Sequence, residues 1–179
     1  MKKLYYTIAT VMMIMAVIAC KPSKEEKIEN IKQLETQLRA ALTKIDTTKA
    51  QQLVNMYIAY ADEYKTDSLA PVYLFRAADI TMNINKFEQS IGLLDRIRAE
   101  YKQFDKLADC LFLKAFIYEN LMNKLKKADE TYKEFIAQYP DHELASSAKA
   151  AVENLGIPAE DLIRKFEEQN KAAKDSIRA

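Results

Sequence analysis

The sequence predicts an all-α protein: a solenoid of stacked antiparallel helix hairpins with a capping helix at each end. Three observations support this fold class. The chain includes only two glycines and four prolines, the residues on which turns between strands depend. Apolar residues recur at spacings of three and four, as on one face of a helix, and nowhere alternate as in a strand. The pattern also repeats along the chain, as in proteins built from stacked helical units.

The repeat becomes visible when the chain is compared with itself. When the sequence is shifted along itself by the length of one repeat, Ala70 aligns with Ala108, Ala77 with Ala115, Asn85 with Asn123, and Tyr101 with Tyr139. A shift shorter by one position extends the pattern back to Tyr64 and forward to Ala145. We therefore predict repeat units at about 70–106 and 107–143, with partial units on either side. A hairpin of this size cannot bury its apolar face alone, so neighbouring units must stack.

Each unit divides into two amphipathic helices. The helices are expected at 24–44, 48–64, 70–84, 86–101, 107–122, 125–139, 142–155 and 158–177. In the first helix of each unit a small residue, Ala77 or Ala115, stands where the paired helix must approach closely. Ser90 and Ala128 are the small partners on the second helices. Small residues are needed because packed helix axes lie about 8–10 Å apart.

Residues typical of helix ends support these boundaries. Asn85 and Asn123 fall at the inner turns, where a left-handed residue is needed and asparagine tolerates that conformation. Ser68 is a candidate N-cap for the helix at 70–84, and Asp141 for the helix at 142–155. Gly156 is suited to closing the latter helix.

The two terminal helices differ from the repeats. In the first helix Ile31 and Leu34 begin a short heptad-like seam, which fits either a free coiled coil or an N-terminal cap packed on the second helix. We favour the cap. In the last helix Leu162, Ile163 and Phe166 share one face and charged residues fill the others, as in a solvating C-terminal cap.

The segments 85–91 and 127–140 resemble tetratricopeptide repeats (TPRs), and the resemblance extends over about 48–156. The chain is also similar to TPR lipoproteins of Bacteroidota envelopes and, more distantly, to the TPR lipoprotein of the outer-membrane barrel assembly machine. There are departures. The repeat is a few positions longer than is usual for TPRs, Asn85 and Asn123 replace the usual glycine of the inner turn, and Phe116 occupies a slot where a small residue is usual.

The TPR resemblance implies a groove, lined by the first helices, that binds segments of other proteins. Its candidate apolar residues are Val72, Phe75, Met82, Leu113 and Ile117. The alternative is that most of these side chains belong to the core between repeats. A clamp for a C-terminal carboxylate is not expected, because the groove positions that carry lysine and asparagine in such clamps are apolar or acidic here.

Residues 1–19 have the three parts of a secretory signal. Lys2 and Lys3 provide the positive region, and a short apolar core follows from Ile8 to Ile18. This core is shorter than the roughly 20 apolar residues that span a bilayer. The small residue Ala19 then precedes Cys20. The alternatives are an uncleaved anchor helix, or an ordinary signal followed by an incidental cysteine.

Residues Val17–Cys20 resemble the lipobox of bacterial lipoproteins. The resemblance implies that Cys20 carries diacylglycerol, that the chain is cut before it and that the new amine is acylated. The predicted organisation is then a signal peptide at 1–19, a lipidated tether at 20–23 and a TPR-like domain at 24–179. Because Lys21 and not aspartate follows the cysteine, similarity to enterobacterial sorting rules implies the outer membrane. Lys24–Glu26 also resembles a surface-export tag, but this match is weak, because three charged residues at the start of a helix are usually just solvated. We therefore favour the periplasmic face.

No catalytic centre, metal site or cofactor is predicted. Without Lys2 and Lys3, the mature chain would carry 25 basic and 26 acidic residues, which gives no basic surface for nucleic acid. The single histidine, His142, is expected to face solvent at a helix start. Cys110 has no partner if Cys20 carries lipid, and we expect it to be a small buried hydrophobe rather than a reactive thiol.

The function expected from these observations is a lipid-anchored adaptor that binds other envelope proteins or their peptide segments. The membrane contact would be made through lipid at Cys20. The alternative is a structural accessory subunit of an outer-membrane assembly or transport complex. An enzyme is the least favoured reading, because the sequence offers no constellation of nucleophile, base and orienting group.

Overall fold

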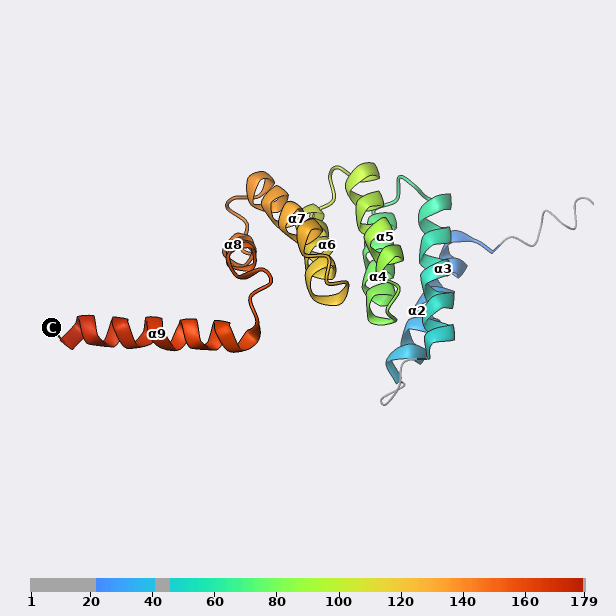
Figure 1. Cartoon of the computed structure of the whole chain (residues 1–179). Helices are drawn as coiled ribbons and strands as arrows, with labels where there is room; N and C mark the ends of the chain where they lie inside the picture. Colours follow the sequence, from blue (N-terminus) through green and yellow to red (C-terminus); the bar gives the residue numbers. More distant parts are fainter. Residues whose placement is uncertain (1–21, 41–45, 179) are drawn as a thin grey trace, which may run out of the picture. The chain divides into compact units, whose positions relative to one another are not determined.

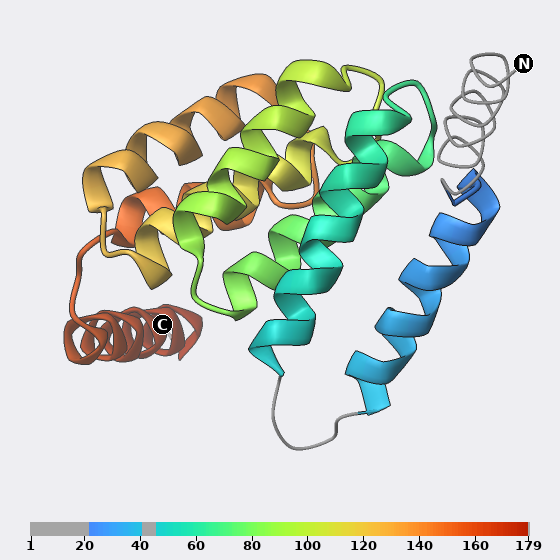
Figure 2. The same ribbon diagram turned by 90° about the vertical axis from the view of Figure 1, so that its right-hand side faces the viewer.

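The structure, a computed structural model, describes residues 22–40 and 46–178 (Figure 1). Over those residues the chain forms eight α-helices and one π-helical turn, without any strand. The elements are α2 (Lys24–Ala40), α3 (Thr47–Glu63), α4 (Leu69–Asn83), α5 (Phe87–Glu100), α6 (Leu107–Phe116), η1 (Ile117–Leu121), α7 (Leu125–Gln138), α8 (Ala145–Asn154) and α9 (Ala159–Arg178). Consecutive helices from α4 to α8 pack against one another (Figure 2). The predicted all-α architecture of stacked hairpins is confirmed.

The described residues fall into two compact units, divided within α3 after Met56. In the first unit Ser23 caps α2, because its Oγ accepts a hydrogen bond from the backbone N–H of Glu26 at 3.1 Å. Asp46 caps α3 in the same way and accepts two backbone N–H groups, each at 3.0 Å. Ile31 and Leu34 of α2 are buried, so the predicted apolar seam is covered. The end of the predicted first helix, at 41–44, and the signal and Cys20 lie outside the described residues.

The second unit contains the repeats. In its first hairpin the small residues meet as predicted: Ala77 on α4 and Ser90 on α5 are both fully buried. The Ser90 hydroxyl donates to the backbone oxygen of Ala78 at 2.8 Å. Thr81, also buried, donates to the oxygen of Ala77 at 2.8 Å. These bonds satisfy the hydroxyl groups, so the helices can approach closely without an unpaired buried donor.

The three inner turns share a left-handed residue. Asn85 has φ 60°, Asn123 has φ 50° and Gly156 has φ 77°. After Asn85 the chain closes α4 with a hydrogen bond from the N–H of Lys86 to the oxygen of Thr81 at 2.8 Å, the pattern of a Schellman cap. The predicted role of the two asparagines is confirmed.

Asn123→Ala is therefore expected to lower the free energy of unfolding by about 1 kcal/mol, because alanine pays a steric penalty in the left-handed region. Asn123→Gly is the matched control and should leave stability unchanged or slightly raised. Urea unfolding followed by circular dichroism measures both. Equal losses for alanine and glycine would show that the asparagine side chain, and not the backbone conformation, matters at this position.

The loops between hairpins repeat one geometry. Each contains a hydrogen bond from a backbone N–H to the oxygen three positions earlier, in the pairs Asp67 to Tyr64 (2.9 Å), Phe104 to Tyr101 (3.0 Å) and His142 to Tyr139 (3.2 Å). These pairs recur at the same spacing as the sequence repeat. The repeat is thus visible in backbone hydrogen bonds as well as in residue identity.

Three predictions are wrong: the two helix caps at Ser68 and Asp141, and the solvent-facing position of His142 at a helix start. The Ser68 side chain makes no capping hydrogen bond. Asp67 takes that role, since its Oδ1 accepts the N–H of Leu69 at 2.8 Å. Helix α8 begins at Ala145 and not at 142, so Asp141 does not cap it. His142 is half-buried in the preceding loop, where its Nδ1 accepts the N–H of Leu144 at 3.2 Å.

The core of the second repeat is a cluster of rings centred on Phe135, which is fully buried. The rings of Phe112 and His142 meet it edge to face, with centroids 5.5 and 5.6 Å away, and Tyr139 lies at 5.6 Å. Edge-to-face pairs of this kind contribute about 0.5–1.5 kcal/mol beyond burial. The cluster explains why His142 turns inward instead of facing solvent.

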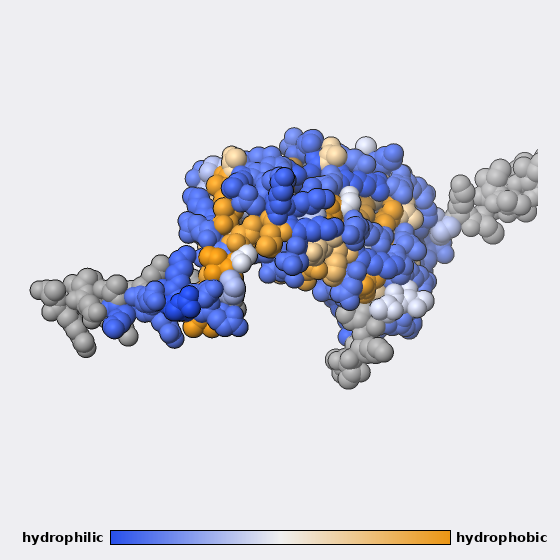
Figure 3. All heavy atoms as spheres, in the orientation of Figure 1, coloured by the Kyte–Doolittle hydropathy of each residue, from blue (hydrophilic) through white to orange (hydrophobic). Residues whose placement is uncertain are grey.

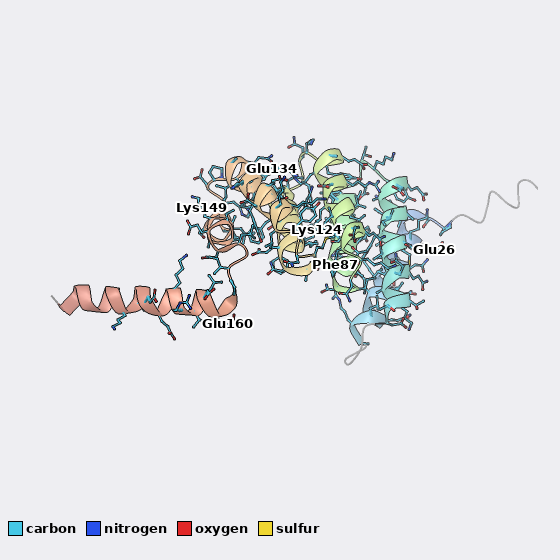
Figure 4. All side chains as sticks on the ribbon, viewed as in Figure 1. Glu26, Phe87, Lys124, Glu134, Lys149 and Glu160 are labelled. Atoms are coloured by element: carbon cyan, nitrogen blue, oxygen red, sulfur yellow. The ribbon has the colours of Figure 1, made fainter. Side chains whose placement is uncertain are left out.

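Ion pairs join neighbouring helices across the stack. Arg96 on α5 binds Asp62 on α3 at 2.7 Å. Arg98, also on α5, binds Glu134 on α7 at 2.8 Å, and Figure 4 labels this glutamate. All of these side chains are partly exposed, so each pair contributes little to stability. They favour the observed register of the helices, because opposite charges meet in this alignment.

The C-terminal part consists of α8 and α9. Gly156 turns the chain beside α7: a Cβ at this position would lie 3.1 Å from the Leu125 side chain. Helix α9 begins at Ala159, directly after Pro158, close to the predicted start. Among the described helices, none is both long enough and apolar enough to cross a membrane.

Candidate protein-binding groove

The candidate groove residues lie on α4 and at the α6–η1 junction. Val72, Phe75, Met82 and Leu113 are half-buried, so each offers part of its surface to a ligand. Ile117 differs, because none of its surface is exposed. Ile117 therefore belongs to the core and does not line an open groove, which corrects its inclusion among the candidates.

Phe75 is the anchor of the α4 side. Its ring packs against Phe104 of the loop between α5 and α6, with centroids 6.4 Å apart at 61°. The ammonium group of Lys106 lies 5.7 Å from the centre of the Phe75 ring, within the range of a cation–π contact. The loop thus fixes the ring while leaving part of it accessible.

Phe116 is a further candidate for the groove, which the sequence pattern did not predict. It is a large hydrophobic side chain with 37% of its surface exposed. Residues three apart on a helix are neighbours on the surface, so Phe116 extends the apolar face of Leu113. The signal was present, because Phe116 stands where a small residue is usual. Its repeat equivalent, Ala78, is fully buried.

The two first helices differ at their C-terminal ends. Both bury their small residue, Ala77 or Ala115. One position later they part: Ala78 is buried and Asp79 exposed on α4, whereas the equivalent Phe116 is exposed and Ile117 buried. The difference therefore begins where η1 follows α6.

A π-helical turn follows directly after Phe116. The N–H of Met122 donates to the oxygen of Ile117 at 3.0 Å, and that of Lys124 to the oxygen of Tyr118 at 2.7 Å. Such turns are rare and often occur at functional sites. The turn is held from α7, since the Tyr132 hydroxyl donates to Glu119 Oε2 at 2.8 Å. Burial, followed by this contact with a carboxylate, raises the pKa of Tyr132, so the phenol stays protonated as a donor.

The hairpin that carries Leu113, Phe116 and the π-turn is the part of the chain recognised by comparison with known families. Residues 109–142 match the tetratricopeptide repeat. A search of curated proteins finds no significant match. The TPR match covers nearly all of α6, together with η1 and α7, and the repeat indicates a scaffold for protein–protein interaction. The TPR resemblance in the sequence is thereby confirmed for this hairpin, and the match includes no catalytic family.

A cleft lies beside the loops that join the hairpins. Its volume is about 530 Å³, and it lies between the loop after α3, the start of α4 and the loop after α5. Val72 lines it together with Pro71, Tyr101 and Phe104. Among the candidate groove residues, Val72 is the one that lines this cleft. Figure 3 shows one face of the molecule, which is mainly hydrophilic with hydrophobic residues in narrow patches.

Across residues 22–40 and 46–178, no three His, Cys, Asp or Glu side chains are grouped so that they could hold a metal ion. Cys110 is fully buried, and this burial raises the pKa of its thiol to about 12. The thiol is therefore protonated at neutral pH and inert as a nucleophile. The prediction of a small buried hydrophobe at this position is confirmed.

Proposed function

We propose that this protein is a lipid-anchored TPR adaptor that holds segments of other envelope proteins against α4 and α6. The observation that carries the proposal is the exposed Phe116 beside Leu113, on the hairpin that matches the TPR family. Full burial of such a side chain contributes about 1.5–3 kcal/mol, and a partner that covers the exposed 37% of Phe116 would gain the corresponding part of it. Aromatic side chains are also enriched among the residues that dominate binding energy.

The membrane tether is supported by the sequence that leads up to Cys20. Two lysines, a short apolar core and Ala19-Cys20 occur in the order of a lipoprotein signal. A diacylated and N-acylated Cys20 would hold the chain on the membrane, since each buried CH₂ contributes about 0.8 kcal/mol. We propose the outer membrane as the location, with the protein on its periplasmic face.

The groove is tested by Phe116→Lys. Because Phe116 is already partly exposed, this change should leave the helical content unchanged, while a charge in the groove should reduce partner co-purification by about tenfold or more. Ala137→Lys is the control. It places the same charge at an exposed position of α7, on the face opposite the buried Ala128. The measurement is quantitative mass spectrometry after affinity purification from cells.

Equal co-purification of partners with Phe116→Lys and with the unaltered protein would reject the groove assignment. A loss with both variants would point to a general charge effect instead. Circular dichroism must accompany both measurements, because a variant that has lost helicity says nothing about the binding surface.

A further inference from the structure

The π-turn carries a second exposed hydrophobic side chain beside Phe116. Leu121, the last residue of η1, has 38% of its surface exposed, nearly the same fraction as Phe116. Among the described residues of α3 to α8, no other large hydrophobic side chain is as exposed as these two. Single exposed hydrophobic residues are common on protein surfaces, whereas neighbouring ones indicate an interaction site.

The hydrogen bonding of the π-turn sets both side chains on one face. Residues five apart in an α-helix lie about 140° apart around the axis, which would turn Leu121 away from Phe116. In a π-turn each N–H bonds the oxygen five positions earlier, as that of Met122 does with Ile117 at 3.0 Å. Residues five apart then lie nearly above one another. One face of α6 and η1 is therefore an apolar strip of three side chains, Leu113, Phe116 and Leu121.

Side-chain hydrogen bonds hold the apolar strip in place. Asn120 Nδ2 donates to the backbone oxygen of Phe116 at 3.3 Å and to Glu119 Oε2 at 3.2 Å. The same carboxylate oxygen accepts the Tyr132 hydroxyl from α7. The strip is thus fixed before any partner arrives, and a preorganised surface loses less conformational entropy when it binds.

Positive charge gathers at one end of the apolar strip. Three exposed lysines follow it at the inner turn and the start of α7: Lys124, Lys126 and Lys127. Figure 4 labels Lys124, whose Nζ lies 3.5 Å from a carboxylate oxygen of Glu88 on α5. At the other end of α6, Lys106 and Asp109 lie 3.9 Å apart and offset each other. The excess of positive charge is therefore confined to the inner-turn end.

We propose that the apolar strip docks an amphipathic helix of a partner protein, with acidic residues at one end of that helix, a proposal that rests on the adaptor function above. From Leu113 to Leu121 the strip is at most about 12 Å long at 1.5 Å per residue. A partner helix covers this length with apolar residues at i, i+4 and i+7. Acidic residues beyond that stripe face the lysines, which fixes the direction of the partner helix.

An anionic membrane surface would also attract lysines beside apolar side chains. A protein partner is favoured because the strip and the lysines all lie within residues 109–142, the hairpin that matches the tetratricopeptide repeat. Repeats of this kind present binding surfaces to other proteins.

The test is photo-cross-linking in living cells, with a photoreactive phenylalanine analogue placed at position 116 or at position 121 of the full chain. Both positions should give an adduct with the same protein. Mass spectrometry should place the two cross-linked residues three or four positions apart in that protein, as on one face of a helix. Position 137, exposed on α7, is the control and should give no adduct.

The contribution of charge is tested with two double substitutions. Lys126→Glu with Lys127→Glu should lower the yield of the adduct from position 116 about tenfold or more, because like charges would then face each other. Lys49→Glu with Lys133→Glu makes the same charge change at two exposed lysines elsewhere and should leave the yield unchanged. Circular dichroism should show equal helicity in both variants.

The outcomes separate this inference from the adaptor function. An absence of adducts from position 116 would reject both. An adduct from position 116 without one from position 121 would overturn the inference alone, as would cross-linked residues two positions apart, the spacing on one face of an extended segment. Equal yields from the two charge variants would show that the lysines do not contact the partner. Adducts with lipid in place of protein would assign the strip to the membrane surface and overturn the inference.

Discussion

Phe135→Ala is expected to lower the free energy of unfolding by about 3–5 kcal/mol, as is typical when a fully buried phenylalanine is truncated. Phe135 is the centre of a ring cluster formed by Phe112, Tyr139 and His142. A domain of this size is stable by about 5–15 kcal/mol, so the change removes a large share. Because a repeat stack is held together by contacts between neighbours, the α6–α8 region should unfold first.

Urea unfolding followed by circular dichroism would measure the total loss, and hydrogen exchange would locate it. Ile136→Ala serves as the control, since Ile136 is the next residue on α7 but is only half-buried. Its loss should be clearly smaller. If Phe135→Ala cost less than about 1 kcal/mol, a well-packed ring cluster at this position would be excluded.

Cys20→Ala is expected to move the protein from the membrane fraction to the soluble fraction, because it removes the only proposed site of lipid attachment. The chain should also fail to incorporate labelled palmitate. The effect should be nearly complete, since single weak contacts do not replace covalent lipid chains. Cell fractionation with immunoblotting measures the first outcome and metabolic labelling the second.

Cys110→Ala is the matched control for the tether. It removes the other cysteine of the chain, which is fully buried, and should leave both membrane association and labelling intact. Palmitate incorporation that persists in Cys20→Ala would contradict the lipobox interpretation. Retention in the membrane fraction without labelling would point instead to an uncleaved N-terminal anchor.

The order and type of the helices could be predicted from the sequence because their signals are local. Apolar spacing fixes each helix, and the left-handed turns need a residue such as Asn85 or Asn123, which both adopt positive φ. The loop before α8 was harder to predict. Asp141 is predicted to cap the helix at 142–155, yet α8 starts only at Ala145, and in the loop before it His142 Nδ1 accepts the N–H of Leu144.

The π-turn and the groove depend on long-range packing. A π-turn differs from an α-turn in which carbonyl oxygen each backbone N–H bonds, and no particular residue type is needed for it. The spacing of apolar residues in η1 therefore does not predict the π-turn. At the junction of α6 and η1, Phe116 is exposed and Ile117 buried. This placement depends on packing against neighbouring helices, which periodicity along one helix does not specify. The departure at Phe116 from the TPR pattern was the one available signal.

The central claim is that the surface around Phe116 holds a partner protein. The most direct test is site-specific photo-cross-linking in living cells, with a photoreactive phenylalanine analogue at position 116 or, as a control, at position 137. Our account predicts a discrete covalent adduct with another protein from position 116 and none from position 137. Adducts from position 137 alone, or the same adducts from both positions, would contradict it.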